Sequence, residues 1–348
     1  MAKSCTCCGV GVLSRRGLLT GATALGAAGL FRTADAADKA FRIDVHHHIS
    51  PPSWLEAVKK AKLDNPPMVN WSPERSLEDM DKAGVATAMT SPTTPQLGFL
   101  PAAEAARIAR EANEYARKVA NDYQGRFGMF AMLPMPYVDE SLKEIAYACD
   151  TLHADGIGMM TSYGDKWLGY SEFQPVFDEL NRRKAVVYTH PTGPNCCVNL
   201  VRGVPEAAVE YGTDTTRTIV NLIFSGASQR YADINFIFSH GGGVLTAVAE
   251  RLQIQMVKTP PYAGKFTRDQ VQHELNRFFY DTAQVSNAVT IEALAQLVPP
   301  SQIVFGSDFP YRTAEEHVTG LAQHFKGEVL RGIERDNAAR ILPGVRPV

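Results

Sequence analysis

Short apolar runs with the composition of buried β-strands recur eight times in this sequence, and segments with helical periodicity separate several of them. Between positions 105 and 119, for example, apolar side chains recur every three or four residues, and Gly125 follows as a stop signal. Alternating strands and helices predict a parallel sheet, and eight such strands predict one (β/α)₈ barrel of the TIM type. The expected strands are Phe41–His46, Ala86–Ser91, Phe127–Leu133, Gly156–Thr161, Ala185–His190, Asn235–His240, Phe278–Thr282 and Gln302–Asp308.

Two segments interrupt this alternation. The proline-rich stretch Pro51–Pro73, which contains Trp54 and Trp71, predicts a small insertion over the C-terminal mouth of the barrel. Pro260-Pro261-Tyr262 predicts a second irregular excursion. The rest of the chain lacks a linker or a low-complexity segment, so its length is consistent with one barrel domain.

The first 36 residues have the features of an export signal and are not expected to belong to the barrel. The pair Arg15-Arg16 lies in a twin-arginine signature, and a mildly apolar run to position 31 follows it. Ala34-Asp35-Ala36 matches a cleavage site, so the mature chain would begin at Ala37. A disordered cytoplasmic N-terminus would explain neither motif. We therefore expect a signal peptide at 1–36, a barrel domain at 37–348, and a periplasmic or secreted protein.

The charge balance bears on the class of partner. The chain carries 35 basic and 37 acidic side chains, which gives a net charge of −2. Removal of positions 1–36 would take away four basic residues and one acidic residue and leave a net charge of −5. A negative balance gives no support for binding to nucleic acid or to an anionic membrane surface. The expected partner is a small molecule.

Metal-binding residue types occur at four of the expected strand ends, where barrels of this kind carry their catalytic side chains. His46 and His48 lie at the end of the first strand and share one of its faces, because side chains two residues apart in a strand point the same way. His190, His240 and Asp308 end the fifth, sixth and eighth strands. A single histidine at a strand end is more often structural, but four histidines and an aspartate on one rim favour a metal centre.

The donor types indicate which ion could bind. Three imidazoles and one carboxylate suit Zn²⁺, although another divalent metal could bind, and they leave a coordination position open for water or substrate. Five candidates exceed the four protein positions of such a site. His240 is favoured as a general acid/base, because Gly241-Gly242-Gly243 after it leaves room for a ligand. His47 points away from the face that His46 and His48 share. The other four histidines are expected at the surface: His153, His273, His317 and His324.

Several motifs together carry a family resemblance. They are Ile43–His48, Trp71-Ser72-Pro73, Met80–Val85, Asn113-Glu114, Arg126-Phe127, Leu133-Pro134, His190-Pro191, Ser239–Gly243 and Phe305–Pro310. This pattern resembles the amidohydrolase superfamily, and within it the branch of 2-amino-3-carboxymuconate-6-semialdehyde decarboxylase and 6-methylsalicylate-type decarboxylases. The resemblance implies Zn²⁺ held by His46, His48, His190 and Asp308, with His240 as the acid/base. It also implies that Arg251 reaches the substrate carboxylate of a neighbouring subunit, and hence a homodimer.

Two departures from the semialdehyde decarboxylase narrow the expected substrate. That enzyme has a second carboxylate-binding arginine before the Trp-x-Pro motif, whereas the present sequence has no arginine between Arg42 and Arg75. It also has an aromatic residue after the third ligand, where Thr192-Gly193-Pro194 stands here. A dicarboxylate substrate is therefore disfavoured, and Asp214–Arg217 looks closer to the decarboxylases of salicylate type.

The expected activity is the non-oxidative decarboxylation of a small aromatic or unsaturated carboxylic acid. The metal would act as a Lewis acid on the carboxylate and an adjacent hydroxyl, and Asp308 or His240 would protonate the ring carbon. One alternative is hydrolysis of a lactone, ester or amide by a metal-bound water that Asp308 deprotonates. A second alternative is a periplasmic binding protein that has kept the fold, against which the full set of five rim residues argues.

Overall fold

The computed structural model describes residues 41–342 and 344–345 of the chain. The expected signal peptide at 1–36 lies outside the described residues, so its existence and the export of the protein stay predictions. None of the helices in the described part of the chain is both long enough and apolar enough to cross a membrane.

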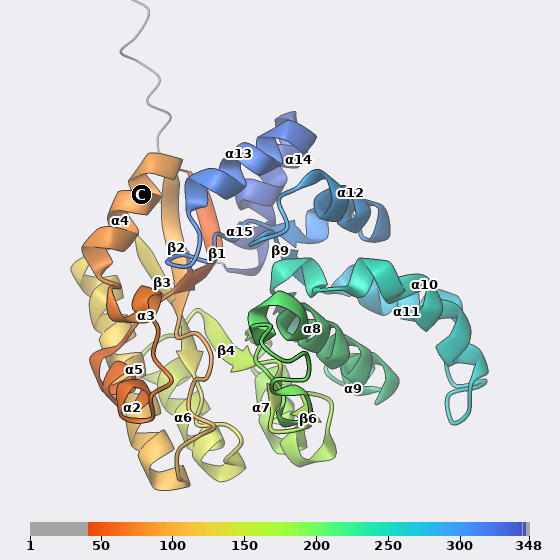
Figure 1. The fold of residues 1–348 in the computed structure, drawn as a ribbon, viewed down its shortest axis with the longest axis horizontal. Coiled ribbons are helices and arrows are strands. Elements are labelled where there is room, and N and C mark those ends of the chain that lie inside the picture. The colour runs from red at the N-terminus through yellow and green to blue at the C-terminus, as the bar shows by residue number, and fades with distance from the viewer. Residues whose placement is uncertain (1–40, 343, 346–348) are drawn as a thin grey trace, which may run out of the picture. The chain divides into compact units, whose positions relative to one another are not determined.

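Eight parallel strands form the central sheet, as the alternating pattern predicts (Figure 1). Their order in the sheet is their order in the sequence, so each strand pairs with the next one along the chain. They are β1 (Arg42–His48), β2 (Val85–Ser91), β3 (Phe127–Met132), β4 (Gly156–Met160), β7 (Val186–His190), β8 (Asn235–Phe238), β9 (Phe279–Asp281) and β10 (Ile303–Val304). Nearly every strand residue is buried, as expected for strands with packed side chains on both faces.

The last expected strand is shorter than its sequence pattern. β10 covers two residues of the predicted Gln302–Asp308, but the chain that follows it stays beside β1 and closes the barrel. The backbone N–H of Val45 donates to the carbonyl of Phe305, and that of Asp308 donates to the carbonyl of His46. Ser307 bonds to the Asp44 carboxylate through its backbone N–H and its hydroxyl. The barrel is therefore closed by irregular backbone that carries Asp308 on its inner rim.

Helices follow the strands and pack outside the sheet, as Figure 1 shows for α5, which packs against β3, and for α6 beside α5. Their starts have local causes, for example the Ser72 hydroxyl that accepts from the Arg75 N–H at the start of α4. Gly84, at φ 64°, ends the same helix in the left-handed conformation that glycine tolerates best. The helices are α2 (Pro52–Lys60), α3 (Pro66–Val69), α4 (Pro73–Ala83), α5 (Ala102–Asp122), α6 (Val138–Asp150), α7 (Gln174–Arg182), α8 (Glu206–Phe224), α9 (Ala227–Arg230), α10 (Leu245–Gln255), α11 (Arg268–Arg277), α12 (Ala288–Leu297), α13 (Ala314–His324), α14 (Gly327–Arg331) and α15 (Asn337–Ile341).

The segment between β1 and α4 forms the two short helices α2 and α3, and Asn65 at the start of α3 reaches the cavity described below. Trp54 is fully buried, and its indole N–H donates to the carbonyl of Gln96. The region of Pro51–Pro73 therefore contributes to the mouth of the barrel, as expected. A small antiparallel hairpin, β5 (Ser162–Tyr163) with β6 (Lys166–Trp167), follows β4.

One prediction about the surface is wrong. His317 is fully buried in α13, where its Nε2 accepts the backbone N–H of Gln284. Its neighbours Glu315 and Glu316 are exposed, so the charged local sequence is typical of a surface segment although His317 itself is buried. His153 and His273 are exposed, and His324 is partly exposed beside Glu292, as expected.

Candidate metal centre and its cavity

Four of the five predicted rim residues converge at the C-terminal end of the barrel. One ligand atom from each of His46, His48, His190 and Asp308 lies within 4.8 Å of the other three, and all four residues are buried. Nε2 of His46 lies 3.2 Å from Nε2 of His48 and 3.2 Å from Oδ1 of Asp308. Nε2 of His48 lies 3.1 Å from the same oxygen. The strand ends therefore bring together the predicted donor set.

The other ring nitrogen of each histidine is held by an oxygen. His46 Nδ1 lies 2.8 Å from the carboxylate Oδ2 of Asp281. His48 Nδ1 lies 3.2 Å from the carbonyl of Ser91, and His190 Nδ1 lies 2.8 Å from the carbonyl of Pro191. Because a carbonyl or carboxylate oxygen only accepts, each Nδ1 carries the proton and donates it. All three imidazoles then turn Nε2 toward the common centre, which is the orientation that a metal ligand requires.

Burial and neighbouring charges shift the pKa values of all four residues. Burial lowers the pKa of His190 well below its usual value and also lowers the pKa of His48, so both rings are neutral. Burial alone would lower the pKa of His46 too, but the charges of Asp281 and Asp308 raise it to about 10. Without a metal the His46 ring is therefore protonated on both nitrogens, and a bound metal would replace the proton on Nε2. Burial opposes ionisation of Asp308, yet the charge of His46 and the contacts of the carboxylate with the rings of His240, His46 and His48 hold its pKa well below the usual value. The carboxylate is therefore ionised.

This arrangement fits a divalent transition metal. Nε2 of His46, Nε2 of His48 and the anionic Oδ1 of Asp308 face one another at about 3 Å, and a positive charge between them, either a proton or a metal ion, stabilises this arrangement. Histidine nitrogens and a carboxylate oxygen are the ligands that such metals take, in the number that leaves a coordination position for a small molecule. The donor set by itself does not distinguish zinc from manganese.

His240 lies beside this cluster but two residues beyond β8, since the strand ends earlier than the predicted Asn235–His240. Its backbone has a φ of 55°, and its N–H donates to Oδ1 of Asp281 at 2.9 Å. Its Nε2 lies 3.6 Å from Oδ2 of Asp308, is buried, and has no hydrogen-bond partner among the described residues. A buried ring nitrogen without a partner at the edge of a cavity can exchange a proton with a bound molecule.

The glycines after His240 have a second role besides the expected one. Gly243 lines the cavity, as expected of residues that leave room for a ligand. However, a Cβ on Gly243 would lie 1.9 Å from the carbonyl oxygen of Gly212 in α8. A Cβ on Gly242 would lie 3.1 Å from the ring of Tyr280. The glycine run is therefore also needed for the close approach of its backbone to that of α8, and this approach positions His240.

Two functional residues escaped the sequence analysis. Asp281 ends β9, is fully buried, and holds both the His46 ring and the backbone of His240. An acidic residue at the end of an expected strand is the signal that could have identified it. Gln284 lies three residues further on, and its side-chain amide donates to Oδ2 of Asp308. No motif in the sequence singles it out.

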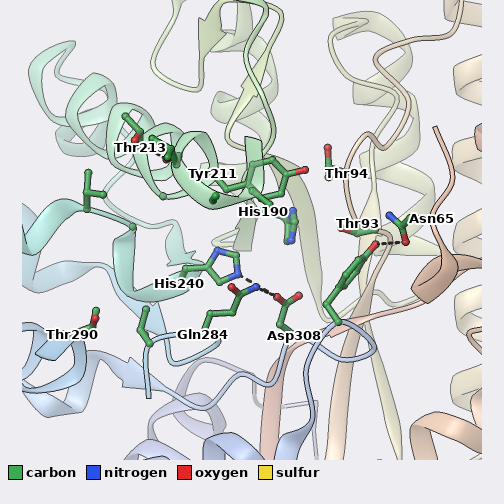
Figure 2. Close-up of a pocket in the computed structure, with 18 residues that line it drawn as sticks. Asn65, Thr93, Thr94, His190, Tyr211, Thr213, His240, Gln284, Thr290 and Asp308 are labelled. Atoms are coloured by element: carbon green, nitrogen blue, oxygen red, sulfur yellow. Dashed lines mark hydrogen bonds and ion pairs between the residues drawn. The ribbon is translucent and has the colours of Figure 1, made fainter. Parts of the chain in front are cut away.

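A cavity of about 520 Å³ lies over the cluster. Figure 2 shows His190, His240, Gln284 and Asp308 around its floor. Val209, Val244 and Val285 supply apolar surface, and the hydroxyl of Tyr311 donates to Oδ1 of Asn65 at its rim. The lining residues are Asn65, Thr93, Thr94, His190, Ala207, Ala208, Val209, Tyr211, Gly212, Thr213, His240, Gly243, Val244, Gln284, Val285, Thr290, Asp308 and Tyr311. None of these lining residues is a lysine or an arginine.

Arg251 lies elsewhere. It is exposed on α10, which packs against α11 at the periphery of the barrel domain (Figure 1). It is not among the lining residues of the cavity in its own subunit, as expected for a side chain that would act in a neighbouring one. Its contact with a second subunit stays a prediction.

Comparison with known proteins gives consistent matches. The family model described as amidohydrolase matches residues 43–344. A decarboxylase of Aspergillus niger is 36% identical over 328 residues, which cover 87% of each chain. The 6-methylsalicylic acid decarboxylase of Aspergillus aculeatus is 34% identical over 327 residues, which cover 88% of this chain and 97% of the relative.

A solved structure of a dihydroxybenzoic acid decarboxylase from Polaromonas sp. JS666, with bound manganese and the inhibitor 2-nitroresorcinol, superposes with a TM-score of 0.78. The match covers 88% of this chain and 98% of that one at 18% sequence identity, so it is a likeness of fold.

Proposed function

Because the chain belongs to the amidohydrolase family, we propose that it is a metal-dependent carboxy-lyase that removes CO₂ from a small aromatic hydroxy acid of the salicylate type. The observation that carries the proposal is the combination of a three-histidine and one-carboxylate centre with a cavity whose lining residues include no lysine or arginine. An acid with one carboxylate can place that group at the metal. A second carboxylate would find no cationic side chain among the lining residues of its own subunit. The relatives named for decarboxylation support this choice over hydrolysis.

His46, His48, His190 and Asp308 are the residues that would hold the metal. When bound, the metal supplies a Lewis acid that neutralises the carboxylate and an adjacent phenolic oxygen. Val209 and Val244 are 47% and 39% exposed on the cavity wall, and we assign them to contact with the aromatic ring. The hydroxyls of Thr93, Thr94, Tyr211 and Tyr311 also line the cavity and can bond to ring substituents.

His240 and Asp308 carry the proton chemistry in this proposal. Decarboxylation replaces a carboxylate on a ring carbon by a proton, and the bond from that carbon to the carboxylate breaks. The electron pair of that bond restores the aromatic ring as CO₂ leaves. His240 Nε2 and Asp308 Oδ2 both face the cavity, lie 3.6 Å apart, and can pass a proton between them and to the ring carbon.

We propose Zn²⁺ as the metal, since three imidazoles and one carboxylate are a common zinc ligand set. Mn²⁺ is the alternative to test, because it is bound in the dihydroxybenzoic acid decarboxylase of the same fold. We also propose export by the twin-arginine route and a homodimer in which Arg251 reaches the partner's substrate. The arginine pair at 15–16 and the exposed position of Arg251 support these two proposals.

The activity is tested with purified protein loaded separately with Zn²⁺ and with Mn²⁺. The substrates are salicylate, 6-methylsalicylate and 2,6-dihydroxybenzoate, with a dicarboxylate and a set of lactones as comparison compounds. We expect CO₂ release and the matching phenol from at least one monocarboxylate, and no ring opening of the lactones. Lactone hydrolysis without any decarboxylation would favour the hydrolase alternative and overturn the proposal.

A further inference from the structure

Three residues around the cavity floor have a left-handed backbone that non-glycine residues rarely adopt. They are His240 at φ 55°, Gln284 at φ 60° and Asp308 at φ 61°. Such conformations persist when surrounding contacts hold them, and they concentrate at functional sites. The contacts that hold His240 and Asp308 belong to the centre described above. Those that hold Gln284 come from outside the barrel.

His317 of α13 holds the backbone of Gln284. The N–H of Gln284 donates to Nε2 of His317 at 2.7 Å, and Nδ1 of His317 donates to the carbonyl of Thr313 at 2.9 Å. The second bond fixes the tautomer, so that Nε2 is a lone-pair acceptor. Because His317 is fully buried, its ring does not exchange this bond for one with water.

Gln284 in turn holds Asp308. Its Nε2 donates to Oδ2 of Asp308, and the side chain lies on the cavity wall (Figure 2). The amide nitrogen of Gln284 faces the carboxylate, because an ionised carboxylate only accepts and the amide nitrogen is the donor. The other oxygen of Asp308, Oδ1, is the one that faces the imidazoles of His46 and His48. The amide of Gln284 therefore bonds to the carboxylate oxygen that does not face the imidazoles.

We infer that Gln284 is a positioning residue that orients Asp308 as a metal ligand, and that His317 acts through it. Nε2 of His240 lies 3.6 Å from Oδ2, which is too long for a good hydrogen bond that could replace the one from Gln284. Without the amide, the Asp308 carboxylate can rotate away from its position between the imidazoles. The inference rests on the proposed metal centre but not on the reaction that the centre catalyses.

Metal affinity is the measurement that tests this chain of contacts. Loss of a group that orients a ligand typically weakens metal binding or activity about 10–100-fold. Gln284→Leu removes the donor, and Gln284→Glu replaces it by an acceptor of the same size beside the Asp308 carboxylate. We expect both variants to bind Zn²⁺ and Mn²⁺ about 10–100-fold more weakly by chelator competition. Gln323→Leu, which makes the same change at an exposed position of α13, is the matched control and should bind as the unaltered protein does.

His317 supplies the second pair of variants. His317→Gln keeps an acceptor near the position of Nε2 and should retain the affinity, whereas His317→Leu should lower it. The double variant Gln284→Leu/His317→Leu should bind metal no more weakly than Gln284→Leu alone. The effects of two substitutions do not add when both residues act through the same contact. Unfolding curves of each metal-free variant show whether it is folded. If His317→Leu does not fold, the metal affinities of Gln284→Leu and His317→Gln still test the inference.

Unchanged metal affinity in Gln284→Leu would overturn the inference, and so would additive losses in the double variant. A loss in Gln323→Leu equal to that in Gln284→Leu would also overturn it. If the protein releases CO₂ from none of the tested acids but these affinities follow the expected order, the proposed reaction fails and the inference about Gln284 stands.

Discussion

Replacing Asp281 by Asn is expected to weaken metal binding while the protein stays folded. Oδ1 of Asp281 accepts the backbone N–H groups of His240 at 2.9 Å and Ala283 at 3.0 Å, and Oδ2 accepts Nδ1–H of His46 at 2.8 Å. An asparagine offers one acceptor oxygen. The two backbone donors cannot turn away, so the amide oxygen takes the place of Oδ1 and the amide nitrogen faces His46.

His46 then has two arrangements, and both oppose the metal. It can move its proton to Nε2, the atom that lies 3.2 Å from His48 Nε2 and 3.2 Å from Asp308 Oδ1. The lone pair needed for coordination is lost in that tautomer. Alternatively, Nδ1–H of His46 stays in contact with the side-chain amide of the new asparagine. Two buried donors then face each other without an acceptor, which costs about 1–3 kcal/mol. That range agrees with the 10–100-fold loss typical for such positions, which corresponds to about 1.4–2.7 kcal/mol.

Two measurements on Asp281→Asn test this reasoning. Chelator competition should show the weaker affinity for Zn²⁺ and Mn²⁺. Urea unfolding of the metal-free variant should show a smaller loss in the free energy of unfolding than Asp281→Ala shows, because the backbone hydrogen bonds survive. Asp281→Ala is the control, since it leaves three buried donors without an acceptor at about 1–3 kcal/mol each and should lower the free energy of unfolding as well. Undiminished metal affinity in Asp281→Asn would refute the tautomer argument.

Further predictions concern the other predicted site residues and the N-terminus. His190→Ala should lose most of its metal and its activity, and stoichiometric metal by elemental analysis would contradict the ligand assignment. His240→Asn should keep its metal and lose about 10²–10⁴-fold in rate, as expected for an acid/base group, and loss of metal would make His240 a ligand. Mixing His190→Ala with Arg251→Ala should restore part of the activity if the arginine acts in the partner subunit, whereas inactive mixed dimers would mean that it does not. Arg15→Lys with Arg16→Lys should keep the precursor inside the cell by fractionation, and normal export would exclude a twin-arginine route.

The positions of the metal-centre residues along the chain were predictable because a parallel barrel gathers all its strand ends at one rim. His46, His48, His190 and Asp308 could be assigned to that rim by locating strands, without any distance between them. The two-residue period of a strand also places His46 and His48 on one face. His47 lies on the other face, where it contacts Asp44 and Ser76.

The orientation of these ligands could not be read from the sequence. Which nitrogen of His46 faces the centre depends on Asp281, which is 235 positions away in the chain. The position of the Asp308 oxygens depends on Gln284, and the backbone of Gln284 depends on His317 in a helix whose local pattern resembles a surface. Periodicity reports which face a side chain occupies, because that face is set by the geometry of one element. Hydrogen bonds between elements depend on how the elements pack, and so the tertiary structure alone decides which donor meets which acceptor.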